Sequence, residues 1–324
     1  MLSAKENALK LFHHEIPDYI PKYGEGIINN VPVGGFYERP AGGKGGLDWF
    51  GVEWVFEEGD PAPMPSQNYI LEDICEWEDV IRFPDLDAFD WEAAAKTDRI
   101  PEFDRENHLL SQIIHQGCLE RLNSTMGMEE GLCALITDPD ECKDFFEAVA
   151  DHKCRLLDKL HEYYKPDIVC YHDDWGSQKS LLIPPETWRE QLLPATKRIA
   201  QHAKELGIFF ELHSDGMIKD IVPEIVEEIQ PDAIQLMRLN NIPELKKMTG
   251  RKVVYDVFVD IQSIDAQENA GTLTEEILRD QINKEFTEQA FGGAYLPNLY
   301  MIHPKWRDVV FDEFEKMRMK IYQG

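Results

Sequence analysis

The feature that most constrains the fold is a regular alternation of short apolar runs and longer amphipathic stretches, which begins near residue 108. The apolar runs predict strands near 109–114, 167–171, 208–212, 233–237, 252–256 and 293–296. The amphipathic stretches predict helices near 118–124, 129–136, 139–164, 185–206, 217–229, 242–248, 274–290 and 304–322. Strands that alternate with helices form a parallel sheet covered by its crossover helices. The number of units favours a closed (β/α)8 TIM barrel over an open sheet.

The first 107 residues lack this rhythm and predict a helical and loop-rich N-terminal extension. Ser3 and Glu6 have the spacing of a capping box, so we expect a short helix over 3–12. Residues 22–66 are rich in Gly, Pro and aromatic side chains, which predicts long loops with short strands. A chain of 324 residues with 43% hydrophobic content can bury one large core, so we expect a single domain over 1–324. Residues 108–324 supply the main βα units.

The charge balance excludes two classes of partner. The chain has 33 Lys and Arg against 61 Asp and Glu, a net charge of −28. Such a surface repels phosphate backbones and anionic lipid, so we expect binding to neither nucleic acid nor a membrane. No run of 18 apolar residues predicts a membrane-spanning helix, and the N-terminus lacks the apolar run of a signal peptide. We therefore expect a cytoplasmic protein whose six scattered cysteines are reduced thiols.

Imidazole and carboxylate side chains follow two neighbouring predicted strands. His172 and Asp174 come after the strand 167–171, and His213 and Asp215 come after the strand 208–212. Barrel enzymes carry their catalytic groups at these strand ends, so we predict that these four residues are catalytic. Such a cluster suits a divalent ion such as Zn²⁺, and it equally suits acid–base catalysis without a metal. The structural alternative is that Asp173 or Asp215 caps the helix that follows it and that a histidine only forms hydrogen bonds in the barrel mouth.

Five further side chains near strand ends are candidates for substrate binding. Three are aromatic and are predicted to form a stacking wall for a planar ligand, although ordinary packing explains each of them equally well: Tyr171, Trp175 and Tyr295. Gln178 and Arg238 lie in loops after two predicted strands and are the polar candidates. No glycine-rich phosphate-binding motif follows a strand, so we expect no dinucleotide or nucleoside triphosphate site.

Several motifs spread over essentially the whole chain resemble the uroporphyrinogen decarboxylase superfamily. The segments that carry this resemblance are Ile16-Pro17-Asp18-Tyr19-Ile20-Pro21, Asp48-Trp49-Phe50-Gly51, Phe83-Pro84-Asp85-Leu86-Asp87, His172-Asp173-Asp174-Trp175-Gly176-Ser177-Gln178 and His213-Ser214-Asp215-Gly216. The superfamily implies a barrel and one of two reactions. One is decarboxylation of uroporphyrinogen, and the other is methyl transfer from a small methylated substrate, such as a methoxylated aromatic compound or a methylamine, to a corrinoid protein.

The resemblance is closer to the corrinoid-dependent, O-demethylase-like methyltransferase branch. The decarboxylases hold a substrate with many carboxylates through an arginine-rich N-terminal segment, whereas Lys22 to Gly46 offers only Lys22, Arg39 and Lys44. We therefore expect a methyltransferase, with a decarboxylase of a porphyrinogen or other small acid as the alternative. A ligand-binding barrel without catalytic activity is a third interpretation.

The zinc-dependent methyltransferases of the superfamily bind their metal through an H-x-C-G segment and a later cysteine. His213 matches the histidine, Asp215 stands where the first cysteine is expected, and no cysteine follows Cys170. The resemblance therefore predicts a metal site at His213 and Asp215, joined by His172 or Asp174, in which carboxylate replaces thiolate. A site that works without metal stays open. The methyl donor and the oligomeric state, a homodimer included, also stay open.

Overall fold

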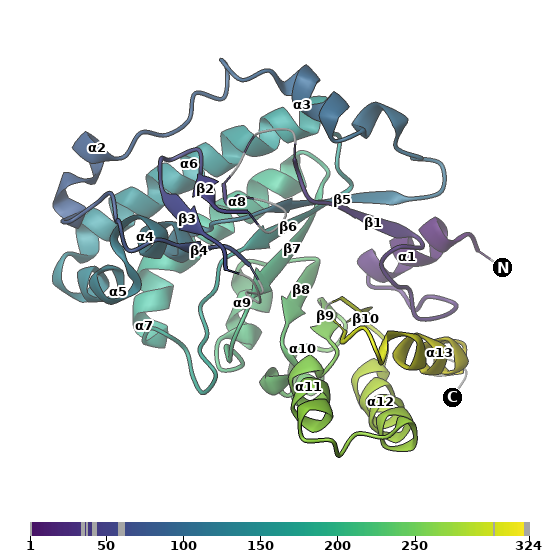
Figure 1. Ribbon diagram of the computed structural model, residues 1–324. Coiled ribbons are helices and arrows are strands. Elements are labelled where there is room, and N and C mark those ends of the chain that lie inside the picture. Colours follow the sequence, from purple (N-terminus) through teal and green to yellow (C-terminus); the bar gives the residue numbers. More distant parts are fainter. Residues whose placement is uncertain are drawn as a thin grey trace.

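The centre of the molecule is a parallel sheet that curls into a half-barrel (Figure 1). The computed structural model describes residues 2–33, 36, 38–40, 44–57, 62–300 and 302–320. Within these residues the sheet has seven strands in the order β1-β5-β6-β7-β8-β9-β10. They are β1 (Ile27–Asn30), β5 (Leu109–Ile114), β6 (Ile168–His172), β7 (Phe209–Ser214), β8 (Ala233–Leu236), β9 (Val254–Phe258) and β10 (Tyr295–Asn298). Every ladder between neighbours in this sheet is parallel.

The predicted α/β barrel fold is confirmed, although seven strands rather than the eight of a closed barrel form the sheet in the described residues. Six of these strands lie within two residues of the predicted ranges. The seventh strand, β1, is a correction, because we placed residues 1–107 outside the main βα units. Ile27–Asn30 has two apolar residues followed by two asparagines, too short a pattern to predict a strand. It joins the sheet through pairing with β5, in which Ile27 lies beside Leu109.

The crossover helices follow the predicted order. They are α4 (Cys118–Met126), α5 (Met128–Thr137), α6 (Pro139–Tyr163), α8 (Leu193–Glu205), α9 (Val222–Glu228), α10 (Ile242–Thr249), α12 (Glu275–Ala290) and α13 (Arg307–Arg318). Three details differ. The helix α11 (Ile261–Asn269) was not predicted, α9 begins five residues later than expected, and residues 185–206 form α7 (Pro185–Thr187), a π-helical turn (Trp188–Leu192) and α8. Pro194 lacks the N–H that would continue an α-helical ladder across this turn, which is consistent with the wider π turn.

The N-terminal part covers one side and one end of the barrel. Its elements are α1 (Ala4–Phe12), a small antiparallel sheet of β2 (Gly46–Leu47), β3 (Glu53–Val55) and β4 (Met64–Pro65), and the helices α2 (Trp77–Val80) and α3 (Trp91–Thr97). The predicted capping box at Ser3 and Glu6 is confirmed.

The amino ends of the strands are closed by an apolar layer. A buried cluster joins Leu11 and Phe12 of α1 to side chains from the first positions of the strands, among them Ile27, Leu109 and Ile168. Burial of these side chains stabilises the fold by roughly 1.5–3 kcal/mol each. Because this end is packed with apolar side chains, the polar chemistry of the barrel lies towards its carboxyl end.

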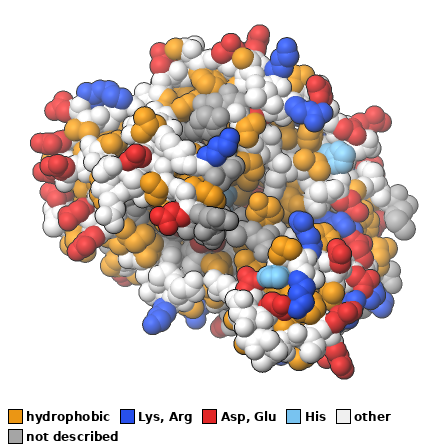
Figure 2. All heavy atoms as spheres, viewed as in Figure 1, with side chains coloured by type: hydrophobic (Ala, Val, Ile, Leu, Met, Phe, Trp, Pro, Cys, Tyr) orange, Lys and Arg blue, Asp and Glu red, His pale blue; other side chains and the backbone are white. Residues whose placement is uncertain are grey.

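The surface carries the acidic excess of the sequence. Asp and Glu side chains are spread around the periphery of the face viewed in Figure 2. None of the described helices is long and apolar enough to cross a membrane. All six cysteines lie in the described part of the chain and none forms a disulfide.

Candidate functional site

One row of polar side chains crosses four neighbouring strands. His172 of β6 pairs in register with His213 of β7, His213 pairs with Gln235 of β8, and Gln235 pairs with Asp256 of β9. Side chains at the same register of a parallel sheet point to the same face, and here that face is the barrel interior. Asp174 and Asp215 lie two positions after His172 and His213, respectively, so the loops after β6 and β7 bring both carboxylates to this row.

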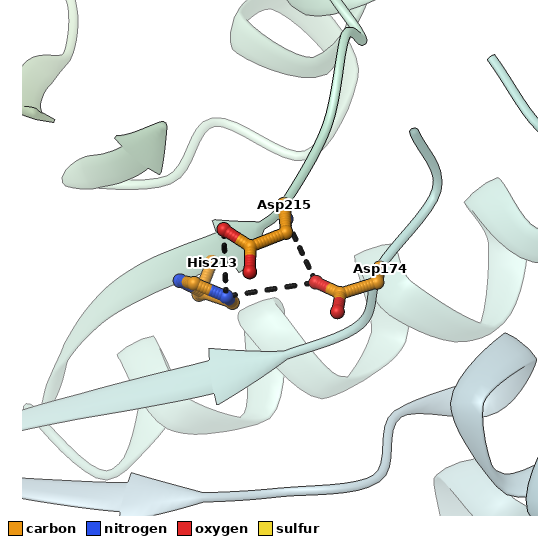
Figure 3. A group of neighbouring side chains, drawn as sticks. All are labelled: Asp174, His213 and Asp215. Carbon is orange, nitrogen blue, oxygen red and sulfur yellow. Dashed lines mark hydrogen bonds and ion pairs between the residues drawn. The ribbon is translucent and has the colours of Figure 1, made fainter. Parts of the chain in front are cut away.

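His213, Asp174 and Asp215 form a compact cluster at the carboxyl edge of the sheet (Figure 3). The Nε2 atom of His213 lies 3.5 Å from Oδ1 of Asp174 and 3.7 Å from Oδ1 of Asp215. Asp174 Oδ1 also accepts a hydrogen bond of 2.7 Å from the backbone N–H of Asp215, which ties the two loops together. His213 is buried, while the two carboxylates are partly exposed. The cluster is therefore open on its carboxylate side.

A hydrogen bond on the other ring nitrogen fixes how His213 meets this cluster. Nδ1 of His213 lies 2.6 Å from Oε1 of Gln235. An amide oxygen only accepts, so Nδ1 carries a proton, and in the neutral ring Nε2 presents its lone pair to the two carboxylates. A neutral imidazole in this form can bind a metal or accept a proton at Nε2.

Two more histidines form a stack with His213. The rings of His172 and His213 are 4.0 Å apart and nearly parallel, and His115 meets His172 edge-on at 4.9 Å. Burial lowers the pKa of His172 well below its usual value, and the nearby His213 and His115 lower it further. Burial likewise lowers the pKa of His115. Both rings are therefore neutral at physiological pH, which allows them to pack against His213.

Carboxylates and one cation shape the field around the cluster. Burial raises the pKa of Asp215, and a positive charge on a protonated His213 would oppose this shift. Burial raises the pKa of Glu120 in α4, and the nearby charge of Asp174 raises the pKa of Glu120 further. The charge of Arg39 acts on both Asp215 and Glu120 and lowers their pKa values. The site therefore combines a concentration of negative charge with one nearby guanidinium.

The four residues predicted to be catalytic come together in the structure, but two of the predicted aromatic residues lie on the opposite face of the sheet. Tyr171 and Tyr295 belong to the register row next to that of His213, so their side chains point towards the covering helices. Tyr171 is fully buried and its hydroxyl accepts a hydrogen bond from the backbone N–H of Cys118. Tyr295 is fully buried against Phe286. A ligand stacked in the barrel mouth does not reach either ring.

The other three substrate-binding candidates also lack a place in the cluster. Trp175 is fully buried and packs edge-on against Trp188, with ring centres 5.6 Å apart. Gln178 is exposed in the loop after β6. Arg238 forms an ion pair of 2.8 Å with Asp260. These residues were predicted to lie near the barrel mouth because they follow or end predicted strands. A position in the sequence does not show which way a side chain points.

Asp173 caps a helix, as the structural alternative predicted, but it caps a different helix from the one that follows it in the chain. Its carboxylate accepts hydrogen bonds from the backbone N–H groups of Leu119 and Glu120, at the start of α4 rather than of the helix that follows it. Burial raises its pKa to about 6. Asp173 is thus structural, and of the two consecutive aspartates only Asp174 joins the cluster.

The residues of the site that were not predicted from the sequence include Glu120, Gln235 and Asp256. Gln235 and Asp256 lie on the same strand face as His213, and their position could have been found by counting alternate residues along β8 and β9. Glu120 lies in the first turn of a helix, where a carboxylate most often interacts with the helix dipole, so its sequence position gave no distinct signal.

Residues 122–256 match the family model of uroporphyrinogen decarboxylase (URO-D). This range contains β6, β7, β8 and the residues Asp174, His213, Asp215 and Gln235. No curated protein sequence matches the chain. The match confirms the resemblance for the segments that begin at His172 and His213, while the three earlier segments lie outside the matched residues.

One solved structure shows the same fold over nearly the whole chain. A methyltransferase from Methanosarcina mazei superposes with a TM-score of 0.67 at 11% sequence identity, covering 98% of this chain and 99% of that one. A xylose isomerase-like TIM barrel protein from Mycobacterium smegmatis in complex with magnesium gives a TM-score of 0.33 at 14% identity, covering 70% of this chain and 76% of that one. The first match shows a shared fold, and the second is too weak to support an argument.

Proposed function

The chain has the fold of the uroporphyrinogen decarboxylase superfamily and matches its family model over residues 122–256, and on this premise we propose that it is a methyltransferase. Its substrate is a small methylated compound, such as a methoxylated aromatic compound or a methylamine, and its methyl acceptor is the cobalt of a corrinoid protein. The observation that carries this proposal is the cluster of His213, Asp174 and Asp215 at the carboxyl edge of the sheet. The methyltransferase from Methanosarcina mazei, which shares the fold, supports it.

The cluster fits a divalent cation. Its three candidate ligand atoms lie within 4.8 Å of one another, and Nε2 of His213 has a free lone pair. One imidazole and two carboxylates are harder ligands than the cysteines that the family's zinc sites use, and they still suit Zn²⁺. When bound, the ion supplies Lewis-acid polarisation of the atom that carries the methyl group.

The remaining residues prepare the site for methyl transfer. The His172 ring, held neutral by burial, packs on His213 and keeps its plane fixed. Asp174 anchors the backbone of the loop that carries Asp215. In the reaction, the bond between the methyl carbon and the substrate oxygen or nitrogen breaks, the methyl group passes to Co(I), and the leaving atom takes up a proton. Because Asp215 serves as a ligand of the ion, the candidate proton donor is the carboxyl group of Glu120, which lies near Asp174 and whose pKa is raised by burial.

The proposal is tested by a methyl-transfer assay on protein purified without added metal. Metal content is measured first, and reduced cobalamin is then mixed with methoxylated aromatic compounds, methylamines or methanol. We expect one bound divalent ion per chain and the absorption spectrum of methylcobalamin with one class of donor. A chelator that removes the ion should abolish the reaction.

Variants assign the activity to the cluster. His213→Ala is expected to lower the methyl-transfer rate by about 10²–10⁴-fold, the range typical for loss of a group that acts directly on the reaction. His202→Ala removes a histidine that pairs with Asp158 on the outer surface and serves as the matched control, with no expected change in rate. A folded, metal-loaded protein that transfers no methyl group from any of these donors would contradict the proposal.

The second candidate is decarboxylation of a porphyrinogen or of another small acid, because the matching family model is that of the decarboxylase. Incubation with uroporphyrinogen and chromatography of the products decides this alternative. Conversion to products with fewer carboxyl groups, together with no methyl transfer, would favour the decarboxylase.

A further inference from the structure

Gln235 lies between the cluster and a second polar group deeper in the barrel. Its side-chain oxygen faces Nδ1 of His213 at 2.6 Å, and its side-chain nitrogen donates a hydrogen bond to Oδ2 of Asp256. Gln235 is 6% exposed and Asp256 is fully buried, so water competes little for either contact. The amide therefore links His213 to Asp256 through two directed hydrogen bonds.

The two ends of this link require opposite hydrogen-bonding roles. A carboxylate can only accept, so it selects the NH₂ group of the amide and turns the amide oxygen towards His213. The oxygen in turn selects the proton on Nδ1. If Asp256 were absent, the amide could rotate and present its NH₂ group to His213, which would place the proton on Nε2 instead.

Asp256 is itself held by a buried group beneath the site. The hydroxyl of Tyr23 lies 3.1 Å from Oδ2 of Asp256 and 3.2 Å from Oε2 of Glu211. Glu211 and Asp256 are both fully buried. Tyr23 comes from the segment before β1, so the N-terminal part of the chain fixes the position of Asp256 from below. This arrangement gives Asp256 one orientation with respect to Gln235.

We propose that Gln235 and Asp256 are positioning residues, which hold His213 in the tautomer protonated at Nδ1 and so direct the lone pair of Nε2 at Asp174 and Asp215. This inference deepens the proposed function, and it rests on that function only for its consequence, the binding of a cation. Groups that orient a histidine ligand through its second nitrogen typically change metal affinity by about 10–100-fold when they are removed.

The direct test is the ¹⁵N chemical shift of the His213 ring, identified as the signal that disappears in His213→Ala. The spectra are recorded without metal over a pH series that reaches the neutral ring, and we expect the neutral ring of the wild-type protein to be protonated at Nδ1 and bare at Nε2. In Gln235→Leu, which loses both hydrogen bonds, the signal should shift to a mixture of tautomers or to Nε2–H. Gln235→Glu retains an oxygen acceptor for Nδ1 and should restore the wild-type tautomer.

The consequence is tested by titrating the same proteins with Zn²⁺. The affinity of Gln235→Leu should be about 10–100-fold lower than that of the wild type, with partial recovery in Gln235→Glu. Gln191→Leu is the matched control, because Gln191 is a buried glutamine that donates to the backbone of Leu135 outside the site. It should lower stability but leave both the tautomer and the affinity unchanged.

The results separate this inference from the proposed function. A neutral wild-type His213 ring that carries its proton on Nε2 overturns the inference without any variant, so it can be rejected even if Gln235→Leu does not fold. An unchanged tautomer in folded Gln235→Leu also overturns it. If the tautomer changes as expected but the protein transfers no methyl group, the positioning role stands and the proposed function fails.

Discussion

At the scale of single residues, a contact between two glycines determines where the candidate ligands lie. Gly176 lies two positions after Asp174 in the loop after β6, and Gly216 lies directly after Asp215 in the loop after β7. A Cβ atom on Gly216 would lie 2.2 Å from the carbonyl carbon of Gly176, and one on Gly176 would lie 2.6 Å from that of Gly216. Only glycine at both positions allows the two loops to approach so closely. This approach brings the two carboxylates to the same side of His213.

Gly216→Ala should therefore damage the site as well as the fold. Gly216 has a φ of +78°, and the matched control is Gly207, which has a φ of +75° and open space for 4 Å around the position that a Cβ would take. Both substitutions carry about 1–2 kcal/mol of backbone strain. Gly216→Ala adds steric overlap, so we expect a larger loss of unfolding free energy and at least tenfold weaker Zn²⁺ binding. Urea denaturation and Zn²⁺ titration check this, and equal Zn²⁺ affinities in the two variants would contradict it.

At the scale of elements, buried charges join the N-terminal part of the chain to the barrel helices. Arg121 of α4 forms a fully buried ion pair of 2.7 Å with Asp48, and its guanidinium lies over the ring of Phe50 at 3.9 Å. Lys153 of α6 forms a second buried ion pair with Glu38, next in the chain to Arg39. These contacts fix the segment that carries Arg39 against α4 and α6. They also explain how an exterior loop comes to place a cation near the site.

Removing the charge of Arg121 should lower the free energy of unfolding by several kcal/mol. Arg121→Met leaves Asp48 buried without its cation, and the loss of one partner of a buried ion pair typically costs about 3–5 kcal/mol. Arg198→Met removes an exposed arginine that pairs with Glu147 and Asp151, and should cost at most about 1 kcal/mol. The free energy of unfolding in urea at pH 7 measures both. Asp48 also accepts hydrogen bonds from the backbone N–H groups of Phe50 and Val52 and from the indole N–H of Trp54. A difference of less than about 1 kcal/mol between the variants would show that these three donors alone satisfy Asp48.

At the scale of the whole molecule, the excess of negative charge opposes folding. The net charge of −28 is spread over the surface, so compaction brings like charges together. Salt screens this repulsion, since the Debye length falls from about 10 Å at 0.1 M to about 3 Å at 1 M. The exposed ion pairs are weakened by the same screening, but each contributes little.

We therefore expect the melting temperature to rise by a few degrees when NaCl is increased from about 0.1 M to about 1 M. Tetramethylammonium chloride at the same concentrations is the control, because its bulky cation screens charge without binding to the carboxylates of the site. A similar rise in both salts supports screening. An unchanged or lower melting temperature in both would mean that the lost ion pairs outweigh the relieved repulsion.

The sequence by itself determined the order of the elements and the place of the reactive groups along the chain. The alternation of apolar and amphipathic runs is a local property, so it predicted β5 to β10 and most of the crossover helices. The same alternation put His172, Asp174, His213 and Asp215 near strand ends, and the structure brings their side chains together. Two of the five segments that carry the family resemblance contain these same residues.

Only the tertiary structure decided which side chains share a face and which are in contact. Tyr171 and Tyr295 differ from His172 and His213 by one position in the register, and this difference sends them to the opposite side of the sheet. Gln235 meets His213 across 22 residues of chain, a contact that follows from strand pairing and not from any local pattern. Strand β1 likewise forms because its backbone pairs with that of β5, from which it is distant in the sequence. Local periodicity sets what each segment becomes, whereas the pairing of distant segments sets what the site contains.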